Sequence, residues 1–311
     1  MAHDEPFNFT DEAVLVVGCG FIGRHMARKL AGLGCRVSVL NRRDPGGGIQ
    51  AAVARVMVGD ADDPRILSEA VRGVDRIVWC AGGLMPNEAE RDPDDDRART
   101  LNPLSALVSI GPLLAGKSVT YISSGGTIYG NPGTEPVSED QEPDPIGAYG
   151  RTKLTAEDML QEAATRDAFR LRILRCSNVY GPGQPSDRSQ GAVAVFTDHI
   201  SRGIPIQVFG DGDHFRDYVH VDDVVRATHE LWRVDGPVVL NCGSGVPVTI
   251  TGLIEALEVA IGRSAVIERL PARSFDVDGI VLDVTRIREL IEFEPIDLPT
   301  GLGLSLSLGS R

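Results

Sequence analysis

The chain has 311 residues, 42% of them hydrophobic, which is enough for one large domain or two closely packed ones. Its formal net charge of −13 argues against binding to a nucleic-acid backbone, and no apolar run approaches the roughly 20 residues of a membrane helix. Residues 1–12 are polar and lack the apolar core of a signal peptide. We therefore expect a cytoplasmic protein that contacts neither nucleic acid nor membrane. Its five widely spaced cysteines are expected to be reduced thiols rather than metal ligands.

Short β-branched runs alternate with helical patterns in the first half of the chain. Strands are predicted at residues 13–17, 35–40, 55–58, 75–79, 118–123 and 170–175. Helices are predicted at residues 21–33, 64–71, 98–114 and 147–164, with the acidic run at 92–96 as a solvated loop before the third of them. This alternation predicts parallel strands joined by right-handed crossovers, and therefore a Rossmann-type, doubly wound α/β sheet.

The first predicted strand runs directly into a glycine-rich loop. Residues 14–23 read VLVVGCGFIG, which places the pattern G-x-G-x-x-G between a strand and a helix. Gly18 permits a tight turn, Gly20 lets the backbone approach a pyrophosphate, and Gly23 lets the helix pack closely on the strand. The helix N-terminus, with Phe21 and Ile22 in its first turn, then faces the anion. A tight turn without a ligand is the alternative, but this context favours a dinucleotide site.

The end of the second predicted strand bears on which nicotinamide cofactor is used. An acid there would bind the ribose 2′-hydroxyl of NAD, whereas Asn41 followed by Arg42 and Arg43 can accommodate the 2′-phosphate of NADP. The two arginines are alternatively ordinary surface charges, so the sequence favours NADP(H) only slightly over NAD(H). Asp60, after the third strand, is placed to meet the adenine amine. Ala81 and Gly82, after the fourth strand, are placed to form a floor of small residues beside the cofactor.

A Tyr-x-x-x-Lys pattern, formed by Tyr149 and Lys153, lies on the helix predicted at 147–164. Residues at i and i+4 share a helix face, and a lysine cation together with a positive nicotinamide lowers the pKa of a phenol. Tyr149 can then accept or donate the proton of a substrate hydroxyl, while Lys153 can also hold the nicotinamide ribose. A packing tyrosine with a surface lysine is the alternative. The position after a fifth strand, in a chain with a dinucleotide loop, favours the catalytic interpretation.

Beyond residue 180 the regular alternation ends. Helices are predicted near 193–202, 221–232, 250–261 and 284–291, and strands at 206–209, 217–220 and 238–240, while 301–311 stays unassigned. We expect residues 10–176 to form the NAD(P)-binding domain, with the chain returning to it around 217–245. Residues 177–216 and 246–311 would form a smaller, mixed α/β substrate-binding lobe.

Five motifs resemble those of the extended short-chain dehydrogenases, in the nucleotide-sugar epimerase/dehydratase group. They are GCGFIG at 18–23, SSGGTIYG at 123–130, YGRTK at 149–153, RCSNVYGPG at 175–183 and FGDGDHFRDYVHVDD at 209–223. The resemblance spans nearly the whole chain. The last two motifs are the most specific, because in this family they belong to the lobe that holds a nucleotide diphosphate.

The resemblance implies roles for residues on both sides of the site. Tyr149 would be the acid/base and Lys153 its helper, while Asn178, Arg216 and Arg273 would contact the diphosphate of a nucleotide-sugar substrate. An acidic protein needs fixed cations of this kind beside a phosphate. Pairing with a neighbouring acid, Asp213 or Asp217, is the alternative for Arg216, and a free surface charge is the alternative for Arg273.

The resemblance further implies a homodimer. The helices predicted at 98–114 and 147–164 would pair with their copies in a four-helix bundle. Their apolar residues, which include Leu104, Leu107, Leu154 and Met159, exceed what one sheet face should need, although burial within the protomer is the alternative.

The chain departs from the family pattern in three places. Val17 stands where a glycine is usual, and Asn41 stands where an acid is usual, which leaves the cofactor open. Gly125 stands where the catalytic Ser or Thr of the family aligns. We expect Ser124, one step earlier, to supply that hydroxyl to the substrate. The other candidates are Ser123 and Thr127.

The resemblance implies hydride transfer at C4 of a nucleotide-linked hexose. Dehydratases of the group carry acids where Gly126 and Thr127 stand, so elimination of water and decarboxylation are disfavoured. The leading hypothesis is a 4-epimerase, in which Tyr149 takes the C4 hydroxyl proton and the hydride returns to the other face of the 4-keto sugar. The alternative is an NADPH-dependent 4-ketoreductase of a 4-keto-6-deoxyhexose, which residues 41–43 favour. Intact Tyr149 and Lys153 argue against a third hypothesis, a non-catalytic dinucleotide sensor.

Overall fold

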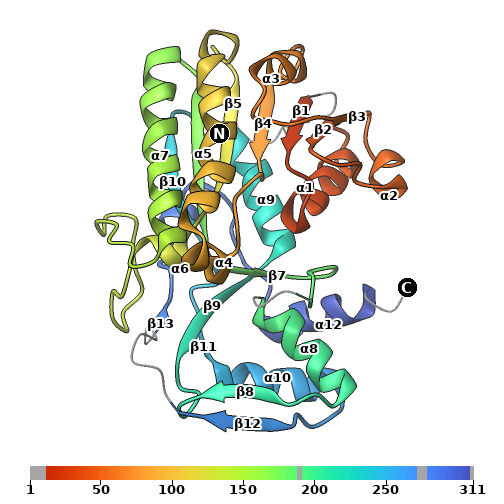
Figure 1. Cartoon of the computed structure of the whole chain (residues 1–311), viewed down its shortest axis with the longest axis vertical. Helices are drawn as coiled ribbons and strands as arrows, with labels where there is room; N and C mark the ends of the chain where they lie inside the picture. Colours follow the sequence, from red (N-terminus) through yellow and green to blue (C-terminus); the bar gives the residue numbers. More distant parts are fainter. Residues whose placement is uncertain (1–11, 188–190, 272–278, 309–311) are drawn as a thin grey trace, which may run out of the picture.

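The computed structural model describes residues 12–187, 191–271 and 279–308, and its core is a seven-stranded parallel sheet (Figure 1). The strand order is β10-β6-β5-β4-β1-β2-β3, and every neighbouring pair is parallel. The strands are β1 Ala13–Val17, β2 Arg36–Asn41, β3 Arg55–Val58, β4 Arg76–Trp79, β5 Ser118–Ser124, β6 Arg170–Cys176 and β10 Val238–Cys242. The order reverses between β1 and β4, where a doubly wound sheet opens its ligand crevice. The structure confirms the predicted fold class.

Helices cover both faces of the sheet, and the alternation of side chains along β1 shows why. Val14 and Val16 pack on the face of α1 (Phe21–Gly32) and α9 (Val221–Glu230), whereas Leu15 and Val17 pack on the face of α5 and α7. The remaining helices of this part are α2 Gly47–Gln50, α3 Pro64–Ala70, α4 Pro86–Arg91, α5 Pro93–Ser109, α6 Gly125–Ile128 and α7 Ala148–Asp167, with 3-10 turns at Gly111–Leu113 and Leu231–Arg233. Phe21 and Ile22 are half-buried at the start of α1.

A second, smaller group of elements lies below the carboxyl ends of the large sheet in Figure 1. It contains a sheet of β7 (Asn178–Tyr180), β9 (Phe215–His220), β11 (Pro247–Thr249) and β13 (Gly279–Ile280), and a separate pair of β8 (Ile206–Phe209) and β12 (Ile267–Leu270). Its helices are α8 Ala192–Arg202, α10 Ile250–Ile261 and α12 Leu298–Leu308, whereas α11 Thr285–Leu290 packs on β10 of the large sheet. Leu253, Leu257 and Leu302 are buried in a core that this group forms by itself.

The structure differs from the predicted elements in several places. The acidic run is not a solvated loop: α5 begins at Pro93, five residues earlier than predicted, because the Asp92 side chain accepts a hydrogen bond from Asp95 N and caps the helix. α5 also ends at Ser109 rather than continuing to 114. β9 begins two residues earlier than predicted, so that Arg216 lies inside the strand. The unassigned tail forms most of α12.

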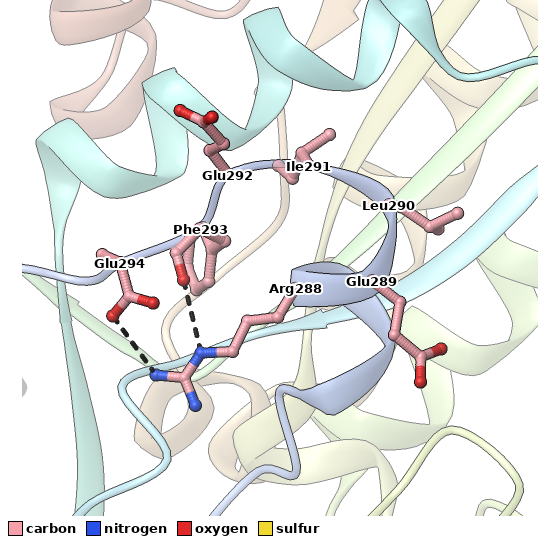
Figure 2. A pocket seen from close by; sticks show the side chains of 7 residues that line it. All are labelled: Arg288, Glu289, Leu290, Ile291, Glu292, Phe293 and Glu294. Carbon is pink, nitrogen blue, oxygen red and sulfur yellow. Dashed lines mark hydrogen bonds and ion pairs between the residues drawn. The ribbon is translucent and has the colours of Figure 1, made fainter.

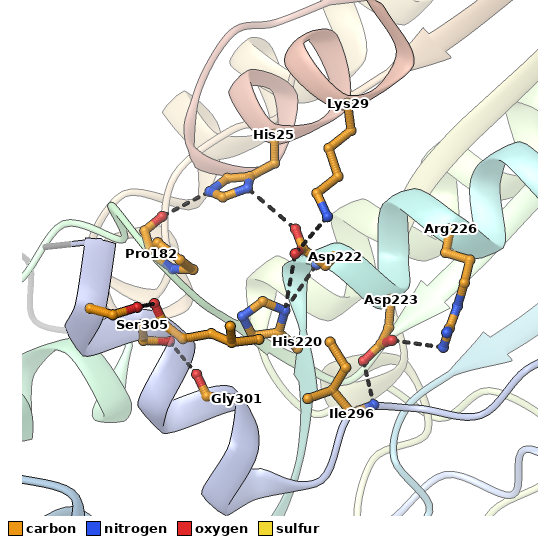
Figure 3. Close-up of polar contacts among 12 residues, drawn as sticks. His25, Lys29, Pro182, His220, Asp222, Asp223, Arg226, Ile296, Gly301 and Ser305 are labelled. Carbon is orange, nitrogen blue, oxygen red and sulfur yellow. Dashed lines mark hydrogen bonds and ion pairs between the residues drawn. The ribbon is translucent and has the colours of Figure 1, made fainter. Parts of the chain in front are cut away.

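An ionic cluster joins α1 to α9, and its His25 also contacts the loop after β7 (Figure 3). Asp222 at the start of α9 receives the Lys29 ammonium of α1 at 2.6 Å and lies 3.7 Å from His25 Nδ1. The Nε2 atom of His25 meets the carbonyl oxygen of Pro182, in the loop after β7, at 2.8 Å. Burial alone would raise the pKa of Asp222, but its contacts with His25 and Lys29 outweigh burial and lower the pKa to about 2. The Asp222 carboxylate is therefore an anion at neutral pH.

None of the helices that the structure describes combines the length and the apolar character needed to cross a membrane. All five cysteines are free thiols, and four of them are buried.

Candidate active site

The loop between β1 and α1 has the geometry of a dinucleotide cradle. Gly18 has a φ of +87°, and an added Cβ would lie 2.5 Å from the backbone nitrogen of Ala81. An added Cβ at Gly23 would lie 2.0 Å from the carbonyl oxygen of Gly18, so neither position admits a side chain. An added Cβ at Gly20, just before α1, would meet nothing within 4 Å. The loop therefore leaves room for an anion at the positive end of the helix.

Asn41, the last residue of β2, ties that strand to the glycine loop. Its Oδ1 accepts a hydrogen bond from the backbone N–H of Cys19 at 2.9 Å, and its Nδ2 donates to the carbonyl oxygen of Arg43 at 2.7 Å. Arg42 and Arg43 are exposed, as is Asp60 after β3. Arg42 and Arg43 are therefore cations at the predicted adenosine end of the site, with the acids Asp44, Asp60 and Asp62 in the same segments.

The segment after β4 connects the glycine loop to α7. Ala81 packs against Gly18, as described above, and an added Cβ at the next residue, Gly82, would lie 3.5 Å from the Nζ atom of Lys153. Ala81 and Gly82 therefore lie between the glycine loop and Lys153.

Tyr149 and Lys153 lie one turn apart at the start of α7. The helix begins at Ala148, whose backbone N–H donates to the Glu90 carboxylate of α4. Lys153 is buried; its Nζ donates to the carbonyl oxygen of Ile122 at 3.3 Å and lies 5.6 Å from the centroid of the Tyr149 ring. Tyr149 itself is half-buried. The structure thus brings the predicted acid/base and its cation together beside the small-residue floor.

The protein's own groups oppose ionisation of Tyr149. Burial raises the pKa of Tyr149 above its ordinary value, and the charge of Asp96 acts in the same direction. Burial lowers the pKa of Lys153, whereas the charge of Asp96 raises it. The predicted lowering of the Tyr149 pKa by Lys153 and the nicotinamide together is therefore not found in the protein without a cofactor, where burial raises the pKa.

Two of the candidate hydroxyl groups lie against α7: Ser124 at the end of β5, and Thr127 in the short turn α6. Thr127 Oγ1 donates to Ser124 Oγ at 3.0 Å. An added Cβ at Gly150 would lie only 2.5 Å from the carbonyl oxygen of Thr127, so α6 packs directly on the residue that follows Tyr149. This contact places the Ser124 and Thr127 pair beside the start of α7.

The position where the family carries its Ser or Thr has no room for a side chain here. An added Cβ at Gly125 would lie 2.6 Å from Leu282 Cδ1 and 2.9 Å from the carbonyl oxygen of Arg175. Ser123 is buried, and its hydroxyl donates to the Glu157 carboxylate. Ser124 and Thr127 therefore remain as the candidate hydroxyls.

A buried polar network that the sequence did not reveal holds α7 against the sheet. Glu157 is fully buried and receives the Arg175 guanidinium of β6 at 2.7 Å. Arg175 also donates to the Tyr129 hydroxyl at 3.0 Å, and Tyr129 donates to Asn241 Oδ1 of β10 at 2.8 Å. Glu157 lies four residues after Lys153, and this helical spacing was the one available signal. The network fixes α7 to β6 and β10.

The predicted diphosphate contacts lie in the smaller lobe. Asn178 begins β7 and is exposed, and an added Cβ at Gly126 of α6 would lie 3.7 Å from its Oδ1. Arg216 is half-buried on β9, and its side chain donates to the carbonyl oxygen of Phe215 at 2.7 Å. The Asp217 carboxylate is buried and accepts hydrogen bonds from the backbone of Ser244 and Leu282, so it is committed to the main chain. Arg273 lies outside the described residues.

A surface pocket elsewhere contains none of the predicted site residues. It is lined by residues 288–294, and in it Arg288 donates to the carbonyl oxygen of Phe293 at 3.3 Å and lies 3.9 Å from the Glu294 carboxylate (Figure 2). We assign no function to this pocket.

Comparison with known proteins agrees with this arrangement. Residues 14–243 match the NAD dependent epimerase/dehydratase family. A UDP-glucose 4-epimerase of Azospirillum brasilense is 32% identical over 306 residues, which cover 91% of this chain and 87% of that protein. A dTDP-4-dehydro-6-deoxyglucose reductase of Escherichia coli is 32% identical over 223 residues, which cover 70% of this chain and 69% of that protein.

A solved structure extends the likeness to three dimensions. The crystal structure of the UDP-glucose 4-epimerase of Thermotoga maritima with UDP-glucose superposes with a TM-score of 0.89 at 30% identity. The match covers 95% of this chain and 98% of that chain. The resemblance stated from the motifs is confirmed, and the chain belongs to the NAD dependent epimerase/dehydratase family.

Proposed function

We propose that the protein is a nucleotide-sugar 4-epimerase that works by reversible hydride transfer at C4 of a nucleoside-diphosphate hexose. The observation that carries the proposal is the direct connection between the cofactor cradle and the proton acceptor. Residues 81 and 82 contact the glycine loop on one side and Lys153, one turn from Tyr149, on the other. The two epimerases named above support the same reaction, because each matches at least 91% of this chain.

Each residue of the site has a separate role in the proposed reaction. The open cradle at Gly20 fits the pyrophosphate of a nicotinamide dinucleotide, which when bound supplies a reversible hydride acceptor. Tyr149 takes the proton of the C4 hydroxyl and returns it after the 4-keto sugar has rotated to present its other face to the cofactor. Lys153 supplies the adjacent positive charge, and Ser124 donates a hydrogen bond to the C4 oxygen. Residues 10–176 with 217–245 would hold the cofactor, and residues 177–216 and 246–311, including Asn178, Arg216 and Arg273, the nucleotide sugar.

The alternative is an NADPH-dependent 4-ketoreductase of a nucleotide-linked 4-keto-6-deoxyhexose. The similarity to the Escherichia coli reductase favours it, as do the exposed Arg42 and Arg43 and the absence of an acid at Asn41. Extraction of the purified protein and mass spectrometry of the released nucleotide separates the two. Tightly held NAD supports the epimerase, and a site that arrives empty and fills with NADPH supports the reductase.

Asn41→Asp is expected to turn the cofactor preference towards NAD(H). The aspartate can keep the acceptor for the Cys19 N–H while its second oxygen binds a ribose 2′-hydroxyl and repels a 2′-phosphate. Hydrogen bonds to charged groups are worth roughly 1.5–3 kcal/mol, so the ratio of the NADPH and NADH dissociation constants should rise about tenfold to a hundredfold. Fluorescence titration of both reduced cofactors measures it. Asn102→Asp, the same change at an exposed position of α5, should leave the ratio unaltered.

We also propose a homodimer through a four-helix bundle of α5 and α7 with their copies. The two helices lie side by side on one face of the sheet (Figure 1). Leu104 and Leu107 are fully buried in the protomer core and give no support, whereas Leu154 and Met159 of α7 are only half-buried. Light scattering at micromolar concentration should give twice the chain mass of 33.3 kDa. Leu154→Arg should yield the monomer mass and Val259→Arg, at an exposed position of α10, the dimer mass; a monomeric wild type would contradict the proposal.

A further inference from the structure

Asp96 is a buried acid within a run of exposed ones. Its side chain is fully buried in the first turn of α5, whereas Asp94 in the same turn is exposed. Its Oδ1 accepts a hydrogen bond from the backbone N–H of Leu84 at 3.0 Å. Its Oδ2 is also buried, and it makes no hydrogen bond within the described part of the chain. Burying a carboxylate costs several kcal/mol unless charge or hydrogen bonds compensate it, so a nearby cation is expected.

The cation lies on the other side of a glycine pair. An added Cβ at Gly83 would lie 2.3 Å from Asp96 Oδ1, and an added Cβ at Gly82 would lie 3.5 Å from Lys153 Nζ. The carboxylate and the ammonium therefore sit against two consecutive residues, on the segment that also touches the glycine loop. A side chain at position 83 would displace the carboxylate, so this close approach depends on a glycine there.

We propose that Asp96 is a positioning residue of the catalytic pair: its carboxylate is the fixed counter-charge of the buried Lys153 ammonium, and it holds segment 82–84 against that lysine. The consequence for turnover rests on the proposed function of Tyr149 and Lys153. The consequence for the charge of Lys153 does not, because it follows from the placement of Asp96 and Lys153 against two consecutive glycines.

Several other groups face Tyr149 and Lys153, from α7 and from the ends of β4, β5 and β6. They are Glu157, Cys80, Tyr121 and Cys176. Burial raises the pKa of Cys80 and of Tyr121 well above their ordinary values, so both stay neutral. Glu157 already receives the Arg175 guanidinium, which offsets its charge. Among the described groups, Asp96 is thus the carboxylate whose charge no arginine offsets.

The sign of its effect follows from Coulomb attraction. The negative charge of Asp96 stabilises the protonated form of Lys153 and opposes the phenolate of Tyr149, so it raises the pKa of both groups. Neutralising Asp96 should lower both pKa values. A role confined to helix capping or packing would change stability and would leave these two titrations where they are.

The direct test is the titration of Lys153 in the cofactor-free protein. The sequence has three lysines, Lys29, Lys117 and Lys153, so ¹³Cε-lysine labelling gives few signals and Lys153→Met assigns the one of interest. In Asp96→Asn, which keeps the shape and an acceptor oxygen, the Lys153 midpoint should fall by about one pH unit or more. Asp94→Asn removes the same charge from an exposed position of the same turn and should leave the midpoint unchanged. Asp96→Glu, which restores the charge, should bring it back towards wild type.

Equal Lys153 midpoints in wild type and Asp96→Asn would overturn the proposal. If the asparagine variant does not fold, Asp96→Ser removes the charge in a smaller side chain and gives the same readout. In the turnover arm, both limbs of the pH profile should move to lower pH in Asp96→Asn and stay in place in Asp94→Asn. A lowered Lys153 midpoint without turnover on any nucleotide sugar would remove the proposed function and leave the role of Asp96 standing. Turnover on a nucleotide sugar with an unchanged Lys153 midpoint in Asp96→Asn would support the proposed function and remove the role of Asp96.

Discussion

Tyr149→Phe is expected to lower the turnover number by about 10²–10⁴-fold, the usual contribution of a general acid–base group. The phenylalanine keeps the ring that packs near Lys153 and removes only the hydroxyl that exchanges the C4 proton. Binding of the sugar nucleotide should survive, because the proposal assigns most of its binding to contacts of the diphosphate with the smaller lobe. Steady-state kinetics together with calorimetric titration of the substrate separates the two effects.

Tyr180→Phe is the matched control for this variant. The Tyr180 hydroxyl is buried and has no hydrogen-bond partner within the described residues, and it lies on β7 in the core of the smaller lobe. Its loss should leave turnover within a few-fold of wild type. Near wild-type turnover of Tyr149→Phe on the natural substrate would remove Tyr149 from the mechanism.

Arg216→Ala is expected to cost about tenfold to a hundredfold in kcat/KM, since hydrogen bonds to charged groups contribute roughly 1.5–3 kcal/mol each. A guanidinium can bind a diphosphate through two parallel hydrogen bonds, which a lysine cannot reproduce. If Arg216 holds the diphosphate, its loss reduces both binding and turnover, because remote binding energy orients C4 against the cofactor. Affinity for the nicotinamide dinucleotide should hardly change.

Titration of UDP and other nucleoside diphosphates into wild type and Arg216→Ala tests this role without turnover. Arg202→Ala, at an exposed arginine of α8 in the same lobe, removes the same charge and should leave the affinity unchanged. Equal diphosphate affinity in wild type and Arg216→Ala would show that Arg216 has a structural role, and the nucleotide-sugar proposal would lose a principal support.

The strands and the glycine loop were predictable because local signals decide them. Buried parallel strands are short runs of β-branched residues, and the predicted bounds of β1 to β6 agree with the structure within about two residues. The tight contacts of Gly18 and Gly23 follow from the motif, because its spacing already requires residues without side chains.

The start of α5 was missed although the signal is present. Asp92 before Pro93, followed by three acids, is the pattern of a helix N-terminus, where a capping side chain, proline and negative charge are all favourable. Read as charge alone, the same run looks like a solvated loop. The burial of Asp96 could not be predicted, because it depends on Gly83 and Leu84, which reach it only in the folded chain.

The details of the catalytic cluster depend on contacts between distant segments. Arg175 meets Glu157 across the boundary between β6 and α7, and Leu282 fills the space beside Gly125. The direction of the Tyr149 pKa was predicted from Lys153 and the cofactor, but burial decides it in the protein itself. The spacing in the sequence predicted that Tyr149 and Lys153 lie close together, whereas packing determines the direction of the Tyr149 pKa.

Incubation with a nucleoside-diphosphate glucose labelled with deuterium at C4, in its UDP and dTDP forms and without added reductant, tests the central claim most directly. A 4-epimerase removes the C4 hydride and returns it to the same carbon on the opposite face. NMR should therefore show the nucleotide galactose with deuterium retained at C4 and no net change in the nicotinamide. Absence of interconversion with every labelled nucleotide, or a product that has lost its deuterium, would contradict the account.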